Sequence, residues 1–222
     1  MYQLFIGLIA EGNTDVRFLK SVIYNSIQDI SWDCDSEIEI FDIREIKADG
    51  GGFVEKMLAA SHIASEQYGI SVLCIHTDSD DRTIQSVMEN KFTPFFAELD
   101  KMDDTEYCKH IIPTIPIQMI ESWMLADRDL LKQLINAVGI RDVDLGIERD
   151  PESYADPKAA IENAINIAMS HQPKKRRDSI KISDLYETLG NRLSLDRLRS
   201  IPSFNHFEES VRQNFRDLGL LR

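Results

Sequence analysis

Residues 4–15 read Leu-Phe-Ile-Gly-Leu-Ile-Ala-Glu-Gly-Asn-Thr-Asp, a short apolar run that ends in an acidic turn. A continuous apolar run of this length is typical of a strand covered on both faces. After the turn, the apolar residues take the spacing of a helix that reaches Ile27, with Asn13 or Thr14 as its expected N-cap. The stretch therefore predicts a strand, a tight turn and a helix, with Glu11 at the carboxyl end of the strand.

A second acidic stretch, Thr77-Asp78-Ser79-Asp80-Asp81, follows the apolar run 70–75. Both acidic stretches come after predicted strands, at the edge where open α/β sheets bind their ligands. Alternate residues of an extended segment project to the same side, so Asp78 and Asp80 can face one cation. Clustered carboxylates repel one another unless they are neutralised, and together with Glu11 they predict a site for a hard divalent metal such as Mg²⁺.

Each acidic stretch also has a purely structural interpretation. Glu11 can be an acid that interacts with the dipole of the following helix, and residues 78–81 can form a loop that caps a helix near Thr83. Asp15 fits the first turn of its helix better than the site, and Asp81 is either a supporting ligand or a cap. The apolar strand before Asp78 favours the metal site.

Glu121 interrupts the apolar stretch 116–127. A charge inside a buried element is costly unless it is paired or metal-bound, so Glu121 is either a site residue or part of an exposed stripe beside a buried Trp123. Further along the chain, Asp156-Pro157-Lys158 fits an N-cap followed by the first turn of a helix.

The sequence offers several lysines that could bind a substrate phosphate. Lys158 is either a surface lysine, whose charge is unfavourable near the N-terminus of a helix, or a cation that binds a substrate phosphate. Lys47 and Lys181 are rival candidates for the same role.

Strands and helices alternate over the first two thirds of the chain, and helices fill the last third. Further strands are predicted at 37–43, 70–75 and 111–117. The last contains two prolines, so it either lies at a sheet edge or ends early. Helices are predicted at 53–68, 84–99 with a break or kink at Pro94, 118–138 with a joint near 127–129, 158–169, 183–189, 195–201 and 204–218. The pattern predicts an α/β fold, with a core over residues 1–145 and a helical part over residues 146–222.

The composition of the 222 residues is that of a soluble globular protein, with 43% hydrophobic residues and a net charge of −13. This charge disfavours a free-standing DNA-binding protein, because Lys and Arg supply most nonspecific affinity for nucleic acid. The basic run 174–177 is a local exception that is either a solvated loop or a contact for phosphate or a partner. No apolar run reaches the ~18 residues of a membrane span, and no signal peptide is evident, so we expect a cytoplasmic protein.

The Glu-Gly turn at 11–12 and the Asp-x-Asp at 78–80 together resemble a Toprim domain, the metal-binding fold of topoisomerases, primases and OLD-family nucleases. A longer pattern is similar to a bacterial family of small, largely uncharacterised Toprim-like proteins related to the OLD nuclease domain. That pattern covers residues 11–15 with Phe18-Leu19, then 78–80, 120–127, 156–158 and 201–204.

The resemblance implies a Toprim-like, Rossmann-like core with a mostly parallel sheet. In it Glu11, Asp78 and Asp80 hold Mg²⁺ or Mn²⁺, Glu121 is a further ligand and Lys158 binds or stabilises the phosphate. The implied activity is that of a metal-dependent nuclease or phosphodiesterase, by two-metal hydrolysis of a nucleic acid. The implied role is in bacterial defence against phage or foreign DNA.

Two alternatives to a nuclease stay open. The chain can be a noncatalytic subunit that docks on an ATPase, or a Mg²⁺-dependent nucleotide-binding or nucleotidyl-transferring enzyme. OLD-family nucleases carry an ATPase domain, whereas this sequence has no Gly-x-x-x-x-Gly-Lys-Ser/Thr motif. An ATP-driven function would therefore require a separate ATPase partner.

Overall fold

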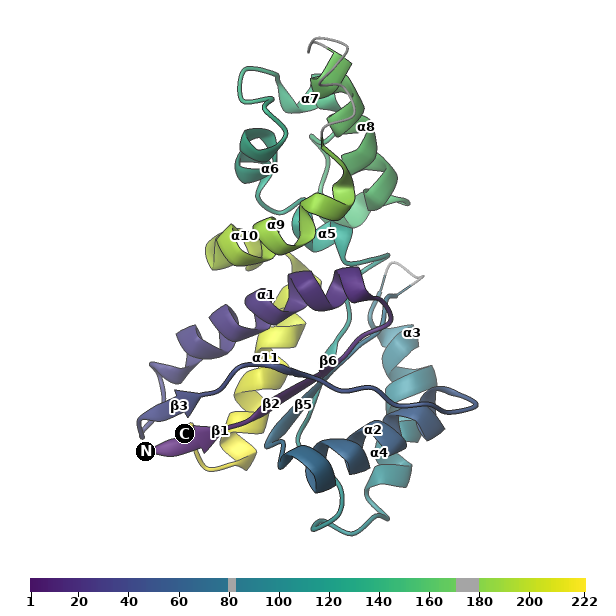
Figure 1. The fold of residues 1–222 in the computed structure, drawn as a ribbon, viewed down its shortest axis with the longest axis vertical. Coiled ribbons are helices and arrows are strands. Elements are labelled where there is room, and N and C mark those ends of the chain that lie inside the picture. Colours follow the sequence, from purple (N-terminus) through teal and green to yellow (C-terminus); the bar gives the residue numbers. More distant parts are fainter. Residues whose placement is uncertain (80–82, 171–179) are drawn as a thin grey trace.

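The structure, a computed structural model, describes residues 1–79, 83–170 and 180–222 and has an α/β fold (Figure 1). Its four-stranded sheet has the order β4-β2-β5-β6. The strands are β2 (Ile6–Ile9), β4 (Arg44–Glu45), β5 (Val72–His76) and β6 (Ile111–Thr114). A two-stranded sheet pairs β1 (Tyr2–Leu4) with β3 (Ile38–Ile40), and all of these strand pairings are parallel. The predicted α/β fold with a mostly parallel sheet flanked by helices is confirmed.

Helices cover both faces of the four-stranded sheet. Figure 1 shows α1 (Asn13–Ser31) and α11 (Pro202–Asp217) on one side, and α2 (Phe53–Tyr68), α3 (Gln85–Val87) and α4 (Thr93–Leu99) on the other. Successive residues of β5 alternate between the two layers, because Val72 and Cys74 pack with α1 whereas Leu73 and Ile75 pack with α2 and α4. This two-sided burial explains why the strand is entirely apolar up to His76.

The helical lobe of the protein comprises α5 (Glu121–Met124), α6 (Arg128–Leu134), α7 (Asp142–Leu145), α8 (Pro157–Ser170), α9 (Tyr186–Arg192) and α10 (Leu195–Leu198). Two short 3₁₀ helices, at 151–153 and 182–184, lie between them. The chain then returns to the sheet through α11, where Asn214 Nδ2 donates to the carbonyl of Ile111 on β6 at 3.0 Å. The division of the chain at residue 145 stays a prediction.

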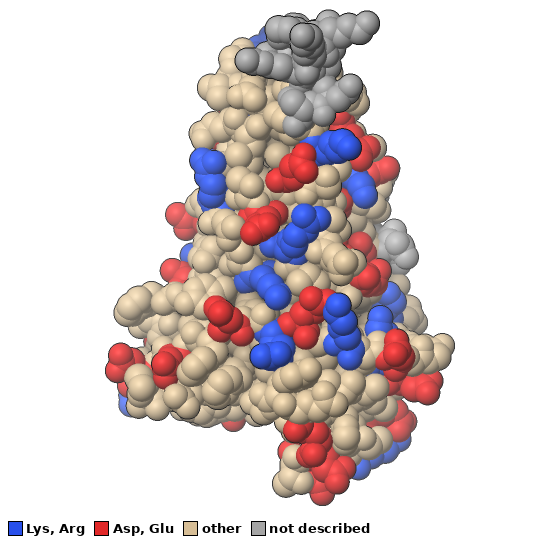
Figure 2. Space-filling view, viewed as in Figure 1, with Lys and Arg blue, Asp and Glu red and all other residues tan. Residues whose placement is uncertain are grey.

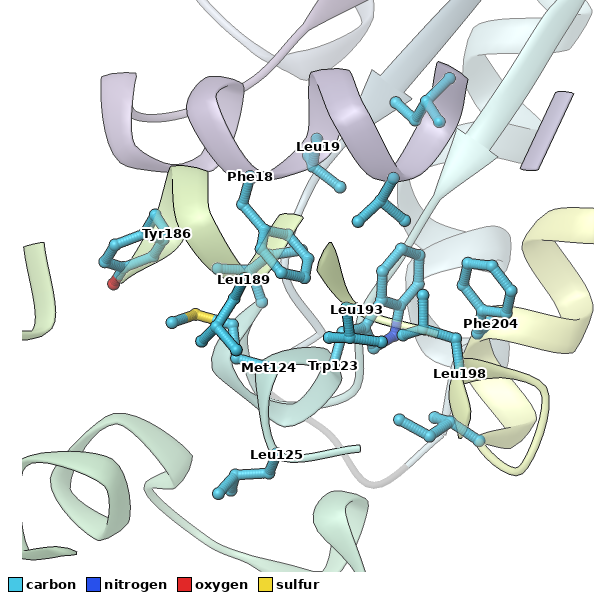
Figure 3. Packing of buried hydrophobic residues seen from close by; sticks show 14 of the residues in the cluster. Phe18, Leu19, Trp123, Met124, Leu125, Tyr186, Leu189, Leu193, Leu198 and Phe204 are labelled. Atoms are coloured by element: carbon cyan, nitrogen blue, oxygen red, sulfur yellow. The ribbon is translucent and has the colours of Figure 1, made fainter. Parts of the chain in front are cut away.

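The lobe joins the sheet layer through aromatic and aliphatic side chains packed under α1. Figure 3 shows Phe18 and Leu19 of α1 facing Trp123 of α5 and Leu189 of α9. Trp123 is fully buried, and its Nε1 donates to Ser203 Oγ at 2.7 Å. The lobe is therefore held to the sheet by a continuous hydrophobic core and by a hydrogen bond that satisfies the indole.

Several elements differ from the sequence-based expectation. The apolar run 4–9 forms two strands, because the chain changes partner at Phe5 between β1 and β2. The helix expected at 84–99 contains a π-helical turn (Met88–Phe92) just before Pro94, which lies in the first turn of α4. Proline lacks an amide hydrogen, so the regular hydrogen-bond ladder cannot continue through it.

Strand β4, only two residues long, was not predicted. None of the described helices is long and apolar enough to cross a membrane.

Gly190 tests the close packing of α9 on α1. A Cβ atom on Gly190 would lie 2.5 Å from the backbone oxygen of Phe18, so Gly190→Ala must push the two helices apart. We expect a loss of roughly 1–3 kcal/mol in the free energy of unfolding, measured by urea denaturation. Gly139→Ala is the matched control, because a Cβ there meets no atom within 4 Å. Equal stability of the two variants would contradict this packing.

Candidate functional site

Glu11 lies just beyond the carboxyl end of β2, beside the carboxyl end of β5. The two strands are paired in parallel, from Ile6 opposite Val72 to Ile9 opposite Ile75, so the residues that follow each strand emerge at the same edge. Thr77 Oγ1 donates to Glu11 Oε1 at 2.9 Å and ties the two strand ends together. Glu11 is nevertheless exposed, so its carboxylate is accessible to a ligand.

Helix α1 begins at the same edge, but its cap differs from the prediction. The N-cap is Gly12, in extended conformation with φ −130°, and not Asn13 or Thr14. The amide of Gly12 donates to Asp15 Oδ2 at 3.0 Å, so the side chain of the third helical residue reaches back to the start of the helix. Asp15 belongs to the first turn of the helix, as expected, and this hydrogen bond also holds its carboxylate at the edge of the sheet.

His76, the last residue of β5, is the buried centre of the site. Its Nδ1 lies 3.2 Å from the carbonyl of Thr114, and since a carbonyl only accepts, Nδ1 carries a hydrogen there. Its Nε2 lies 3.7 Å from Asp15 Oδ2 and 3.6 Å from Asp78 Oδ1. Both His76 Nε2 and Asp78 Oδ1 are buried without a hydrogen-bond partner. The sequence analysis missed His76, although a polar residue at the end of an apolar strand was a visible signal.

The charges around His76 shift three pKa values. Burial raises the pKa of Asp78 to about 7, with Asp15, Glu11 and Glu121 adding to the rise and His76 opposing it. Burial lowers the pKa of His76, but the two aspartates and the Thr114 carbonyl more than offset this, and the net shift is upward. The pKa of Asp15 is also raised by burial, yet contacts with His76, the Gly12 amide and Thr14 give a net lowering. Asp15 and Asp78 therefore favour the protonated form of the His76 ring, and burial together with the acidic neighbours favours the protonated form of Asp78.

Glu121 reaches the site through a turn that follows β6. The segment after β5 pairs with this turn, because the Ser79 amide donates to Pro116 O at 3.0 Å and the Gln118 amide donates to Ser79 O at 2.7 Å. Gln118 then adopts a left-handed φ of 65° and directs the chain into α5. Glu121 is only 4% exposed, so the alternative of an exposed stripe was wrong.

The buried carboxylate of Glu121 has a protein partner that the sequence analysis missed. The hydroxyl of Tyr186, on α9, donates to Glu121 Oε1. Burial and the negative charge of Glu121 raise the pKa of Tyr186, so this hydroxyl keeps its proton and stays a donor. No local pattern identifies Tyr186, which lies 65 residues further along the chain.

Glu11 and Glu121 both lie close enough to Asp78 for their charges to contribute to the raised pKa of its carboxyl group. Asp15 and His76 also lie next to Asp78, although the sequence did not point to either of them as a site residue. Asp80 and Asp81 lie outside the described residues, as does the basic run 174–177.

The predicted lysines are spread over the surface. Lys158 is exposed on the first turn of α8, where Asp156 caps the helix as predicted by accepting from the Ala159 amide at 2.8 Å. Lys181 is exposed beside α8 and lines a hollow with Glu162. Lys47 borders a hollow beside Glu11, but its Nζ pairs with Glu45 at 3.2 Å.

The donor atoms at this edge suit a hard divalent cation. Carboxylate oxygens are the ligands that Mg²⁺ and Mn²⁺ take in proteins, and the buried, partnerless Oδ1 of Asp78 is an atom that a cation would satisfy. Within residues 1–79, 83–170 and 180–222, however, no group of three or more His, Cys, Asp or Glu side chains is arranged to hold a metal ion. The second aspartate of the Asp-x-Asp, Asp80, is not among those residues.

Comparisons with protein family models, with curated proteins and with solved structures found no match to this chain.

Asp78→Asn tests the electrostatics of the metal-free site. With a folded pKa of about 7 and an unfolded value of about 3.9, the Asp78 carboxyl contributes stability that is complete below pH 4 and is lost as the pH rises through 7. In a chelating buffer we expect Asp78→Asn to be more stable than wild type by roughly 1–3 kcal/mol at pH 8, and about equal at pH 4. Urea denaturation of both proteins between pH 4 and pH 8 measures this difference in unfolding free energy. Asp100→Asn, at an exposed position, is the control and should show no such pH-dependent gap.

Tyr186→Phe tests how the buried Glu121 is held. The change removes the hydroxyl donor and leaves the carboxylate unsatisfied, so we expect a loss of about 1–3 kcal/mol in unfolding free energy at pH 7. Tyr24→Phe is the matched control, because no hydrogen bond of the Tyr24 hydroxyl occurs within the described residues. A loss in Tyr186→Phe no larger than that in Tyr24→Phe would contradict the interpretation.

Proposed function

We propose that this chain is a metal-dependent nuclease or phosphodiesterase of the Toprim type. One observation carries the proposal: Asp78 Oδ1 is buried without a hydrogen-bond partner beside His76, and burial, with the neighbouring carboxylates adding to it, raises the pKa of the Asp78 carboxyl group. A cluster of this kind is stabilised by a cation. Its position at the carboxyl edge of a parallel sheet, beside the turn that holds Glu11, supports the same reading.

Glu11, Asp78 and Asp80 would hold Mg²⁺ or Mn²⁺ in this proposal, with Glu121 as the further carboxylate. The bound metal supplies Lewis-acid activation of a phosphate and of an attacking water. The remaining residues position the ligands. The Thr77 hydroxyl fixes one oxygen of Glu11 and leaves the other available, and Tyr186 does the same for Glu121. His76 is a positioning residue, because its buried ring lies between Asp15 and Asp78.

The acidic character of the chain bears on how a nucleic acid would be bound. Figure 2 shows Lys and Arg interspersed with Asp and Glu on the face in view, without a continuous basic surface there. With a net charge of −13, the chain itself provides little nonspecific attraction for phosphates. We therefore propose that a partner, such as a separate ATPase subunit, supplies part of the nucleic-acid contact, in keeping with a role in defence against phage or foreign DNA.

Cleavage of supercoiled plasmid, single-stranded DNA and single-stranded RNA by the purified protein, with Mg²⁺ or Mn²⁺, tests the proposed activity. We expect metal-dependent cutting by wild type and a loss on the order of hundredfold in Glu11→Gln and in Asp78→Asn. Gln at position 11 can still accept the hydrogen bond from Thr77, so that variant changes the charge of the ligand and preserves its shape.

Asp100→Asn, at an exposed position at the end of α4, should cut as wild type does. The proposed activity fails if wild type cuts none of these substrates with either metal, or if both site variants cut at the wild-type rate. Stabilisation of an inactive wild type by a nucleoside triphosphate and Mg²⁺ would instead favour a nucleotide-binding enzyme.

A further inference from the structure

Two lysines that the sequence analysis did not single out lie beside Glu11, on the side of α2. Lys91 comes from the π-helical turn before α4, and its Nζ donates to Thr77 Oγ1 at 2.7 Å. Thr77 in turn donates to Glu11, so the three residues form a chain of hydrogen bonds that ends at the carboxylate. An ammonium group has three donors, and this bond uses one of those of Lys91. A π-helical turn often marks a functional position in a helix.

Lys56, on α2, approaches Glu11 from a second direction. It borders two hollows that both include Glu11, one of about 250 Å³ and one of about 290 Å³. The second hollow also contains Phe53 and His76, and Lys91 Nζ lies 5.7 Å from the centre of the Phe53 ring. Lys56 and Lys91 therefore flank one small region of the surface, with Glu11 and Phe53 between them.

Neither lysine has a carboxylate partner in the described part of the chain. Lys56 and Lys91 are half-buried, yet no Asp or Glu oxygen described by the structure lies within 4 Å of either Nζ. Other lysines of this protein are paired, including Lys101 with Glu98 at 2.7 Å and Lys132 with Asp142 at 2.7 Å. A half-buried ammonium without a counter-charge has lost part of its hydration, and a bound anion would compensate for that loss.

The site is therefore electrically asymmetric. Asp15 and Asp78 lie next to His76 Nε2, and the charge of Glu121 acts on Asp78. On the side of α2 lie two ammonium groups. A phosphate bound on the α2 side would contact the ammonium groups of Lys56 and Lys91, and the carboxylates near His76 would lie on its opposite side.

We propose that Lys56 and Lys91 form a phosphate subsite, which receives a phosphate group of a nucleic acid or nucleotide beside Glu11. This proposal rests on the function proposed above and adds the direction from which the substrate enters. The hollows are smaller than the ~300–1,000 Å³ of pockets that enclose whole ligands, so the subsite takes a phosphate and its immediate surroundings rather than a complete nucleotide.

Binding in the absence of divalent metal tests the subsite separately from catalysis. The probe is a fluorescently labelled, 5′-phosphorylated single-stranded DNA octamer, titrated in EDTA at low salt and followed by anisotropy. We expect Lys56→Met and Lys91→Met each to weaken binding about tenfold, because each removes a charge-assisted hydrogen bond. Lys91→Arg should retain most of the affinity, since it keeps the charge and the donors.

Lys20→Met is the matched control. Lys20 is also half-buried, has no ion pair among the described residues, and lines a different hollow next to Asn191. Its replacement changes the net charge by the same amount, so its binding should stay within twofold of wild type. Thermal unfolding of all variants confirms that they fold.

Equal weakening in all three Met variants, or no change in any of them, overturns the subsite. An octamer without the 5′-phosphate shows which phosphate the subsite binds. If the Met variants lose the same tenfold in affinity for this octamer, the subsite binds an internal phosphodiester. If they lose affinity only for the phosphorylated octamer, it binds the terminal phosphate, and both results support the subsite.

Cleavage in Mg²⁺ or Mn²⁺ separates this proposal from the proposed function. A wild type that binds as expected but never cuts contradicts the nuclease and leaves the subsite standing. If wild type cuts, and Lys56→Met and Lys91→Met bind and cut as it does, the subsite fails and the nuclease stands.

Discussion

The parallel pairing of β2 with β5 is the constraint on which the site depends. It places the residues after Ile9 and after His76 at one edge, and the hydrogen bond from Thr77 to Glu11 fixes their separation at 2.9 Å between the two oxygens. Every other site residue is positioned against this pair. Helix α1 brings Asp15 from one side, the turn at Gln118 brings Glu121, and α2 and the π-helical turn bring two lysines.

Negative charge at this edge is tolerated because each carboxylate has a different means of support. Asp15 accepts from the Gly12 amide, Glu121 accepts from Tyr186, and Glu11 accepts from Thr77. Among the carboxylates of residues 1–79, 83–170 and 180–222, Asp78 differs in having a buried oxygen without a hydrogen-bond partner. The charge imbalance is therefore concentrated at the first aspartate of the Asp-x-Asp, which is where the sequence analysis expected a metal ligand.

The sequence predicted those parts of the structure that depend on local periodicity. Helix α2 occupies the predicted range 53–68, and β5, predicted at 70–75, lies at Val72–His76. A glycine triplet marks the start of α2, and a continuous apolar run marks β5. The site was predictable in part for the same reason, because Glu11 and Asp78 immediately follow apolar strands.

Tyr186 and Lys91 were not predictable in this way. Tyr186 meets Glu121 only through the packing of α9, and Lys91 reaches Thr77 from a π-helical turn that periodicity does not reveal.

The return of α11 to the sheet has a consequence for the order in which the molecule can fold. Helix α11 packs on β6, and Asn214 bonds to Ile111 across 103 residues of sequence. A growing chain that has not yet reached Pro202 has made the six strands found in the described residues, yet one face of its sheet lacks the cover of α11. Contacts of such long sequence separation form slowly, because the intervening chain must be ordered first. During synthesis, therefore, the apolar surface under α11 is exposed from the completion of β6 until residues Pro202–Asp217 have been made.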